Sequence, residues 1–217
     1  MKTVVVSAVF FCCLALATAT QYSCKAQAVQ FPAFKSMENE CIALMKHQVQ
    51  KELNAALTYL AMAAHFSEDQ VNRPGFAKMF FESANEEREH AIKFIEYLLM
   101  RGELETDIKD LISDPYPVRG LTWDSGLAAL KNALALEVNV TKSINEIIKK
   151  CENPDVGEND YHLVDYLTGE FLDEQYKGQR ELAGQISTLG KMTKSLGDLG
   201  EYMFDKKLLD GELPVLG

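Results

Sequence analysis

Apolar residues recur every three or four positions over long stretches of this chain, which is the spacing of helices that bury one face. The first stretch, from Glu38 to Phe66, contains no proline or glycine. The second begins at Pro74, a residue suited to the first turn of a helix, and continues to about Arg101, where Gly102 ends it. We therefore expect one long helix in each stretch.

Three further helices are predicted in the second half of the chain. Thr122 can cap a third helix that continues through Cys151. The fourth should extend from about Asp160 into residues 187–194, and a short last helix should cover Asp198–Leu209. Because no stretch alternates between apolar and polar residues as a strand does, the predicted fold class is all-α.

The lengths of the connections predict how these helices are arranged. Short links join the first helix to the second and the third to the fourth, so each pair should form an antiparallel hairpin. Residues 102–121 between the hairpins include Pro115 and Pro117 and read as a loop, long for a bundle. Such a loop can run the length of the molecule. We expect a four-helix bundle with one long crossover and a short fifth helix.

The N-terminus has the pattern of a signal peptide. Lys2 supplies a positive charge, residues 4–16 are apolar apart from Ser7, and residues 17–19 have the small-x-small pattern of a cleavage site. The apolar run is too short to cross a bilayer comfortably. We assign residues 1–19 to a signal peptide, 20–37 to an N-terminal extension and 38–217 to the bundle. We expect a secreted protein that is not held in a membrane.

Charge narrows the classes of partner. The 217 residues include 32 acidic and 22 basic side chains, which gives a formal net charge of −10. Nucleic-acid binding needs basic surface, so this balance disfavours it. An acidic chain suits the handling of cations, although many ordinary soluble proteins are as acidic.

The cysteines fit an oxidising compartment. Removal of the signal peptide takes Cys12 and Cys13, which leaves Cys24, Cys41 and Cys151. This odd number suggests one internal disulfide and one thiol free for another chain. The long crossover places the end of the third helix beside the start of the first, so we expect Cys41 to pair with Cys151. Cys24 then remains for a neighbouring subunit.

Polar residues interrupt the apolar faces at positions suited to metal ligands. Glu52, Glu87 and Glu137 each stand in the middle of an apolar stripe, on three different helices. His90 lies one turn after Glu87 on the same face, which is the Glu-x-x-His spacing of di-iron helical bundles. A buried carboxylate without a partner costs several kcal/mol. Each residue alone has an ordinary explanation, but their recurrence on three helices favours a metal site.

The fourth helix leaves its contribution open. Glu174 and Gln175 both fit the stripe between Phe171 and Gly178. Tyr59 lies two turns after Glu52 on the same face, where a core tyrosine is also common. A site of carboxylates, one imidazole and an amide suits iron or manganese better than structural zinc.

The sequence resembles the ferritin family over nearly all of the predicted mature chain. The resemblance is carried by four motifs, which are Asn85-Glu86-Glu87-Arg88-Glu89-His90-Ala91, Ala135-Leu136-Glu137-Val138-Asn139-Val140, Leu172-Asp173-Glu174-Gln175 and Glu201-Tyr202-Met203-Phe204-Asp205-Lys206. It implies the ferritin-like four-helix bundle and a heavy-chain-type subunit with a di-iron ferroxidase centre.

The resemblance also implies the ligands of that centre. One iron would be held by Glu52, Glu87 and His90, and the other by Glu87, Glu137 and Gln175. Tyr59 would be the nearby tyrosine that hydrogen-bonds the site. Fe(II) and O2 would be the substrates, and a ferric mineral core would be the product.

The predicted signal peptide and lumenal cysteines are similar to the secreted insect-type branch of the family. There the resemblance implies a 24-subunit shell of heavy-type and light-type subunits, with Cys24 bridging to a light-type subunit. Leu199, Met203 and Lys207 share a face that would line the four-fold axis. Three alternative functions make different predictions. A light-type ferritin subunit would lack the complete set of ligands, and an oxygenase acting on an organic substrate would carry a second Glu-x-x-His unit. A metal-free cytokine gives no reason for the glutamates.

Other candidate residues depend on the resemblance. Glu82, Glu86 and Glu89 fall on one arc of the second helix and could seed mineral, whereas a solvated acidic face is the ordinary alternative for Glu82. Iron would enter near Asp165, helped by His162, although Thr168 stands where a second acid is common. Asn139-Val140-Thr141 is a formal glycosylation acceptor. We expect it to stay unmodified because it lies within a helix.

Overall fold

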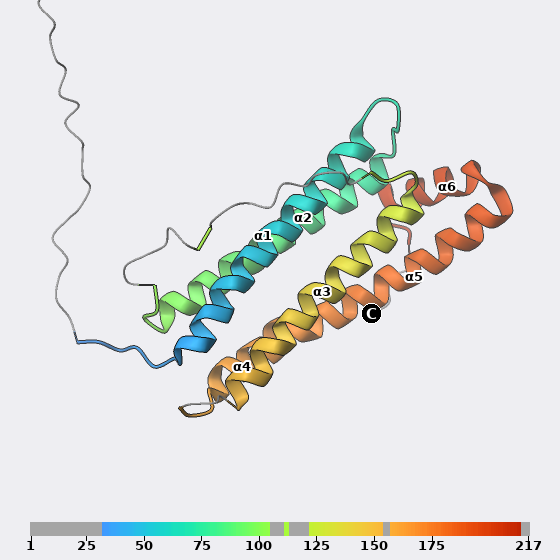
Figure 1. The fold of residues 1–217 in the computed structure, drawn as a ribbon. Coiled ribbons are helices and arrows are strands. Elements are labelled where there is room, and N and C mark those ends of the chain that lie inside the picture. Colours follow the sequence, from blue (N-terminus) through green and yellow to red (C-terminus); the bar gives the residue numbers. More distant parts are fainter. Residues whose placement is uncertain (1–31, 105–110, 113–121, 154–156, 214–217) are drawn as a thin grey trace, which may run out of the picture. The chain divides into compact units, whose positions relative to one another are not determined.

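The computed structural model describes residues 32–104, 111–112, 122–153 and 157–213, and most of these residues are helical (Figure 1). The predicted signal peptide, Cys24 and most of the crossover loop lie outside the described residues. The first three helices are α1 (Asn39–Ser67), α2 (Pro74–Met100) and α3 (Gly126–Glu152). The boundaries of α1 and α2 agree with the predicted ones to within one residue.

The fourth helix of the bundle is continuous but not uniform. It consists of α4 (Tyr161–Leu167), a five-residue π-helix η1 (Thr168–Leu172) and α5 (Asp173–Leu196). Gly197 then adopts a positive φ of 59°, a conformation that glycine adopts without strain, and turns the chain into α6 (Asp198–Leu209). The predicted limits of α6 are confirmed. The π-helix was not predicted.

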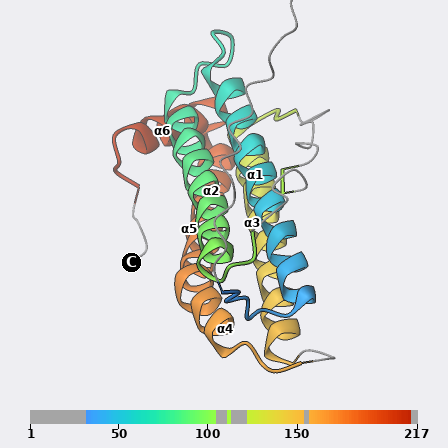
Figure 2. The ribbon, with the colours of Figure 1, turned by 90° about the vertical axis from the view of Figure 1, so that its left-hand side faces the viewer.

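The helices run up, down, down and up, as expected for one long crossover. α1 pairs with α2 and α3 pairs with α5. Two views show α1 and the α4–α5 helix running in one direction and α2 and α3 in the other (Figures 1 and 2). Within the described residues there is no strand, so the all-α bundle is confirmed. None of the helices in this part of the chain is long and apolar enough to cross a bilayer.

The start of α3 differs from the prediction. The N-cap is Ser125, whose hydroxyl accepts a hydrogen bond from the amide of Ala128 at 3.2 Å. Thr122 is exposed and precedes the helix. The helix begins after Trp123, which is buried at the end of the bundle, where its carbonyl accepts a hydrogen bond from His65 Nε2 at 2.9 Å. The predicted cap at Thr122 was therefore wrong.

A disulfide joins the two halves of the bundle. Cys41 lies in the first turn of α1 and Cys151 in the last turn of α3, and their Cα atoms are 5.8 Å apart. Both residues are buried. The predicted Cys41–Cys151 pairing is confirmed, and it follows from the antiparallel packing of α1 on α3.

The last helix supplies hydrogen-bond acceptors to the ends of two earlier helices. The side chain of Asp205 accepts hydrogen bonds from the amides of Gly75 and Phe76, at 2.8 and 3.0 Å, at the start of α2. Glu201 accepts one from the amide of Gly126, at 2.9 Å, at the start of α3. An added Cβ at Gly75 would lie 2.0 Å from the carbonyl oxygen of Asp205, so only glycine permits this approach.

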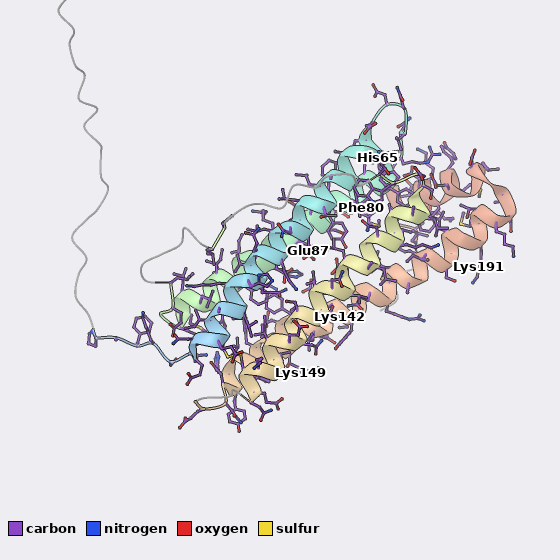
Figure 3. All side chains as sticks on the ribbon, viewed as in Figure 1. His65, Phe80, Glu87, Lys142, Lys149 and Lys191 are labelled. Carbon is purple, nitrogen blue, oxygen red and sulfur yellow. A yellow bond between two sulfur atoms is a disulfide. The ribbon has the colours of Figure 1, made fainter. Side chains whose placement is uncertain are left out.

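The core consists of two apolar clusters with a layer of buried polar side chains between them. This polar layer contains Glu52, Glu87, His90, Glu137 and Gln175. One cluster includes Met45 and Phe94, towards the disulfide, and the other includes Phe66 and Phe80, towards α6. Glu87 is directed into the bundle between the clusters, whereas lysines such as Lys142 are exposed on its outside (Figure 3). The packing of the bundle therefore holds a group of polar side chains in its interior.

Candidate metal centre

Three ligand-type side chains meet in the polar layer between α1 and α2. Glu52 comes from α1, and Glu87 and His90 come from successive turns of α2. They are 0%, 4% and 5% exposed, and each offers an oxygen or nitrogen atom within 4.8 Å of the other two. Carboxylate oxygens and a neutral imidazole nitrogen are ligands for a divalent transition metal.

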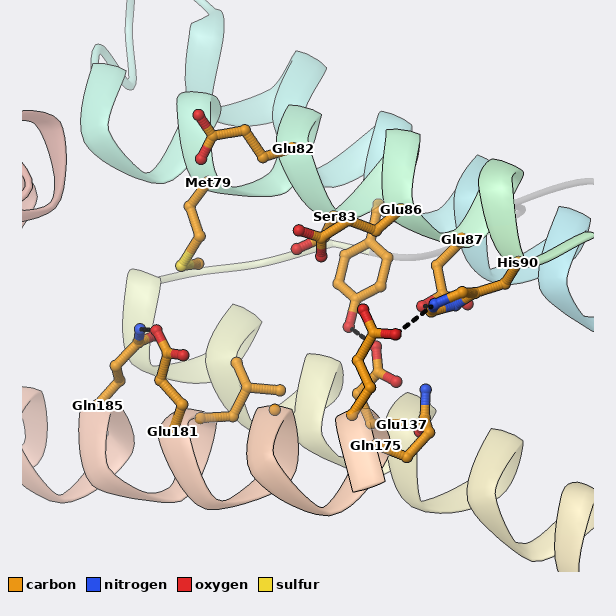
Figure 4. A pocket seen from close by; sticks show the side chains of 14 residues that line it. Met79, Glu82, Ser83, Glu86, Glu87, His90, Glu137, Gln175, Glu181 and Gln185 are labelled. Carbon is orange, nitrogen blue, oxygen red and sulfur yellow. Dashed lines mark hydrogen bonds and ion pairs between the residues drawn. The ribbon is translucent and has the colours of Figure 1, made fainter. Parts of the chain in front are cut away.

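Three more predicted residues complete the polar layer from the other side of the bundle. Glu137 on α3 and Gln175 on α5 are both buried, and the hydroxyl of Tyr59 on α1 donates a hydrogen bond to Glu137 Oε1. All except Glu52 line one pocket of about 220 Å³ between α2 and α5 (Figure 4). The structure thus brings all six predicted centre residues together.

Several ligand-type atoms in this layer have no hydrogen-bond partner among the described residues. They are Glu52 Oε2, Glu87 Oε2 and His90 Nδ1. His90 Nδ1 is 3.5 Å from Glu87 Oε1, but the geometry is not that of a hydrogen bond. Buried polar atoms are almost always paired, so an unpaired group of them needs an explanation. A bound cation satisfies oxygen and nitrogen lone pairs directly.

Gln48 is a buried residue of this layer that sequence reasoning missed. Its Nε2 donates a hydrogen bond to Glu52 Oε1 at 2.7 Å, and the side chain is 0% exposed. This bond occupies one carboxylate oxygen and leaves the other for the site. The available signal was position, because Gln48 is a polar residue one turn before Glu52 on the same buried face.

Burial and mutual repulsion favour the protonated forms of these carboxyl groups. Burial raises the pKa of Glu87 to about 8, and the negative charge of Glu137 adds to this rise. The pKa of Glu52 is also raised, first by burial and then by the charge of Glu87. Burial likewise raises the pKa of Glu137 and of Tyr59. The carboxyl groups outnumber the single imidazole in this layer, and a bound cation relieves their mutual repulsion.

The fourth helix contributes both of the residues that the sequence left open. Gln175 is buried in the layer, whereas Glu174 is 53% exposed and places Oε2 3.4 Å from His90 Nε2. Leu167, Phe171 and Gln175 are spaced four residues apart and are all buried. The wider turn of the π-helix η1 keeps them on one face, and π-turns are frequent at functional sites.

Comparison with known proteins identifies the group to which this arrangement belongs. Residues 42–192 match the ferritin-like domain. The chain belongs to the ferritin family. It is 58% identical over 187 residues to a ferritin heavy chain of Papilio xuthus, covering 86% of this chain and 88% of that one. It is 55% identical to a ferritin heavy chain of Drosophila melanogaster over 172 residues, or 79% and 82% of the two chains.

A solved structure supports the fold of this ferritin chain. The crystal structure of Trichoplusia ni secreted ferritin matches it with a TM-score of 0.82 and 56% sequence identity. The match covers 87% of this chain and 98% of the other. The ferritin-like bundle predicted from the sequence is therefore confirmed.

The remaining predicted residues lie outside the polar layer. Glu82 and Glu86 are exposed and line the pocket, but Glu89 is not among its lining residues and has its Oε1 3.9 Å from Arg88. Asp165 and His162 are exposed on α4, beyond the pocket. The structure does not bring these two into the same cluster as the glutamates.

His162 is engaged with a neighbouring helix. Its Nδ1 forms a hydrogen bond of 2.8 Å with the hydroxyl of Tyr97 on α2. Tyr97 also accepts a hydrogen bond from Arg101, whose guanidinium binds Asp160. His162 is therefore part of the hydrogen-bonding that holds the start of α4 to the end of α2.

Proposed function

We propose that this ferritin chain is a heavy-type, iron-storing subunit that oxidises Fe(II) to Fe(III) with O2. The observation that carries the proposal is the convergence of Glu52, Glu87 and His90, which are buried and whose ligand atoms all lie within 4.8 Å of one another. A pair of Fe(II) ions supplies the positive charge that the raised carboxyl pKa values indicate is missing. Ferritin heavy chains among the relatives support iron storage.

The proposed ligand roles follow the two sides of the polar layer. Glu52, Glu87 and His90 bind one Fe(II), and Glu87, Glu137 and Gln175 bind the other. Glu87 is suited to the shared position because it interacts electrostatically with both Glu52 and Glu137. The Tyr59 hydroxyl, bonded to Glu137, fixes that carboxylate.

Iron is the substrate of this reaction, and each Fe(II) gives one electron to O2. Protonated carboxyl groups release their protons when Fe(II) binds, since a metal ligand must be deprotonated. Di-iron oxidases of helical bundles carry a second Glu-x-x-His unit, but this chain has the neutral Gln175 in the second position. Fewer anionic ligands hold Fe(III) less firmly, which suits iron that leaves the site for a mineral core.

The open side of the pocket suits the movement of ferric iron away from the centre. Glu82 and Glu86 line it together with Glu174, and hard carboxylate oxygens suit Fe(III). We assign Glu82, Glu86 and Glu89 to mineral nucleation, with Glu89 as the outermost. Asp165 and His162 remain our proposed residues for the route by which iron enters.

We propose that exposed apolar side chains of the bundle contact neighbouring subunits in an assembled shell. Leu199 and Met203 on α6 are 55% and 41% exposed, and Lys207 shares their face. Apolar side chains on the surface of a monomer are often covered by other subunits. We propose a 24-subunit shell of heavy-type and light-type chains, secreted after removal of residues 1–19, with Cys24 bridging to a light-type subunit. The similarity to a secreted ferritin supports this location.

Stopped-flow oxidation of Fe(II) by the purified protein, with its size measured by gel filtration, tests the proposal. We expect rapid loss of Fe(II) under O2 and elution as a large shell. A light-type subunit would assemble without rapid oxidation. An oxygenase would consume O2 with an organic substrate, in proportion to that substrate and not to iron.

A further inference from the structure

The hydroxyl of Thr141 is buried and lies within hydrogen-bonding distance of three groups. It accepts one from Gln179 Nε2, at 2.5 Å. It also lies 2.7 Å from Gln175 Oε1 and 2.9 Å from the backbone carbonyl oxygen of Glu137. A threonine hydroxyl has only one hydrogen to donate, so it can donate to only one of these two oxygens at a time. The hydroxyl hydrogen therefore points either to Gln175 Oε1 or to the Glu137 carbonyl oxygen.

Donation to Gln175 fixes one orientation of the amide. With its Oε1 held by Thr141, Gln175 directs its nitrogen to the pocket side, as Figure 4 shows. There the amide hydrogen-bonds Glu137, which together with Tyr59 lowers the carboxyl pKa that burial has raised. In this orientation the amide donates to a carboxylate. The same orientation does not suit a ligand, because an amide nitrogen has no lone pair for a cation.

Donation to the Glu137 carbonyl permits the opposite orientation. This carbonyl lies one turn before Thr141 in α3, so rotating the hydroxyl is sufficient. The Thr141 oxygen then accepts a hydrogen bond from Gln175 Nε2, and Gln175 Oε1 faces the pocket. The two ends of an amide have nearly the same shape, so the exchange leaves the packing unchanged.

We propose that Thr141 is a positioning residue that lets Gln175 present nitrogen to the Glu137 carboxylate and oxygen to a bound cation. The inference rests on the proposed di-iron function and deepens it. Thr141 is buried, and neither it nor Gln179 lines the pocket, so both act through Gln175. The switch also gives Thr141 a role independent of the glycosylation motif in which it occurs.

Anaerobic titration of the assembled protein with Co(II), followed by visible absorption, tests this role without iron oxidation. The central variant is Thr141→Val, which removes the hydroxyl and keeps the branched shape. Thr141→Ser restores the hydroxyl. Asn139→Gln is the matched control for the glycosylation motif, because it removes the motif, lies on the exposed side of α3 and leaves the hydroxyl in place.

We expect the wild-type chain to bind two Co(II) ions. In Thr141→Val the ion held by Gln175 should bind 10- to 100-fold more weakly, the range for loss of a residue that orients a ligand, while the ion at His90 is unaffected. Thr141→Ser and Asn139→Gln should bind like the wild type. Unchanged binding of both ions to Thr141→Val, or equal weakening of both, would overturn the inference. A wild-type chain that binds no Co(II) pair would instead refute the proposed function.

Gln179→Glu provides a second test that keeps the Thr141 side chain. A carboxylate at position 179 accepts the Thr141 hydrogen, so the Thr141 oxygen must accept from Gln175 and the amide oxygen must face the pocket. We expect tighter binding of the second Co(II) than in the wild type, measured at about 1 M salt to reduce the contribution of the added charge. Weaker or unchanged binding at that salt concentration would contradict the switch.

Discussion

The hydroxyl of Tyr59 on α1 donates a hydrogen bond to Glu137 on α3, across the interior of the bundle. The ring packs in the aromatic cluster, with its centroid 6.0 Å from that of Phe80. One side chain thus belongs to the apolar core at its ring and to the polar layer at its oxygen. The position of Glu137 depends on both contacts.

Tyr59→Phe should separate these two roles. The variant keeps the ring and leaves the Gln175 amide as the remaining donor to Glu137, so it should destabilise the iron-free protein by about 1 kcal/mol, the usual net contribution of one hydrogen bond. Iron oxidation should slow without being abolished, because the proposed ligands remain. Chemical unfolding and stopped-flow oxidation measure the two effects. A wild-type oxidation rate would show that Tyr59 has no part in the reaction.

Glu52→Ala and His90→Ala should each abolish rapid Fe(II) oxidation while the shell still assembles. Both residues offer unpaired buried atoms, and the surrounding apolar clusters maintain the bundle without them. Glu96→Ala is the matched control, because it removes an exposed glutamate of α2 that lies outside the pocket and has no proposed role in the reaction. Rapid oxidation in both ligand variants would exclude this centre from the mechanism.

The raised pKa of Glu87 predicts the pH dependence of the iron-free protein. Between the ordinary value of 4.5 and about 8, the folded chain holds a proton that the unfolded chain releases. The free energy of unfolding should therefore fall as pH rises through this window, and a bound divalent cation should oppose the fall. Urea unfolding at several pH values measures the slope.

Glu87→Gln is the control for that slope. The amide has nearly the same size and cannot titrate, so the free energy of unfolding should vary less with pH between about 4.5 and 8. An equal slope in the two proteins would assign the pH dependence to other groups.

Much of the fold was predictable because its signals are local. Helix periodicity, Pro74 and Gly102 fixed the ends of α1 and α2 closely. The N-cap at Ser125 was missed because burial of Trp123 decides where α3 starts, and burial is a property of the folded chain. The choice between Glu174 and Gln175 was left open by periodicity, because a π-turn changes the residue spacing and has no plain sequence signal.

The residues of the candidate site also divide into those that a local sequence pattern reveals and those that only the folded structure reveals. Glu52, Glu87 and Glu137 were visible because each interrupts an apolar stripe. Thr141 was not, because threonine is ordinary within a helix, and its role depends on Gln175 and Gln179, which are 34 and 38 positions away. A pattern within one helix cannot report a contact between two.

The Cys41–Cys151 disulfide should contribute strongly to stability. It closes a loop with a sequence separation of 110, for which the loop entropy corresponds to roughly 4–5 kcal/mol, often less when measured. A chain with both cysteines changed to serine should unfold at lower denaturant and retain iron oxidation, since the bridge lies at one end of the bundle. Changing Cys24 alone should leave subunit stability unchanged and, by our proposal, remove a disulfide-linked dimer from a non-reducing gel.

Asp165→Asn should slow uptake at low Fe(II), because a fixed negative charge concentrates cations at a narrow opening. Thr168→Asp is the reciprocal change, and it should accelerate uptake by adding an acid one turn of helix away. Initial rates at low and high ionic strength test both, since screening should reduce each difference. Identical rates in all three proteins would show that iron enters elsewhere.

The contacts of α6 also bear on how the chain matures during synthesis. The acceptors for the first amides of α2 and α3 are Asp205 and Glu201, which the ribosome adds after every other helix. Both hairpins are therefore synthesised before the acceptors for their first helical amides, and these hydrogen bonds can form only after α6 has been made. A chain cut short before Asp198 would expose those amides and the surface of Phe76, against which Phe204 packs. The final helix thus makes completion of translation a condition for a mature subunit.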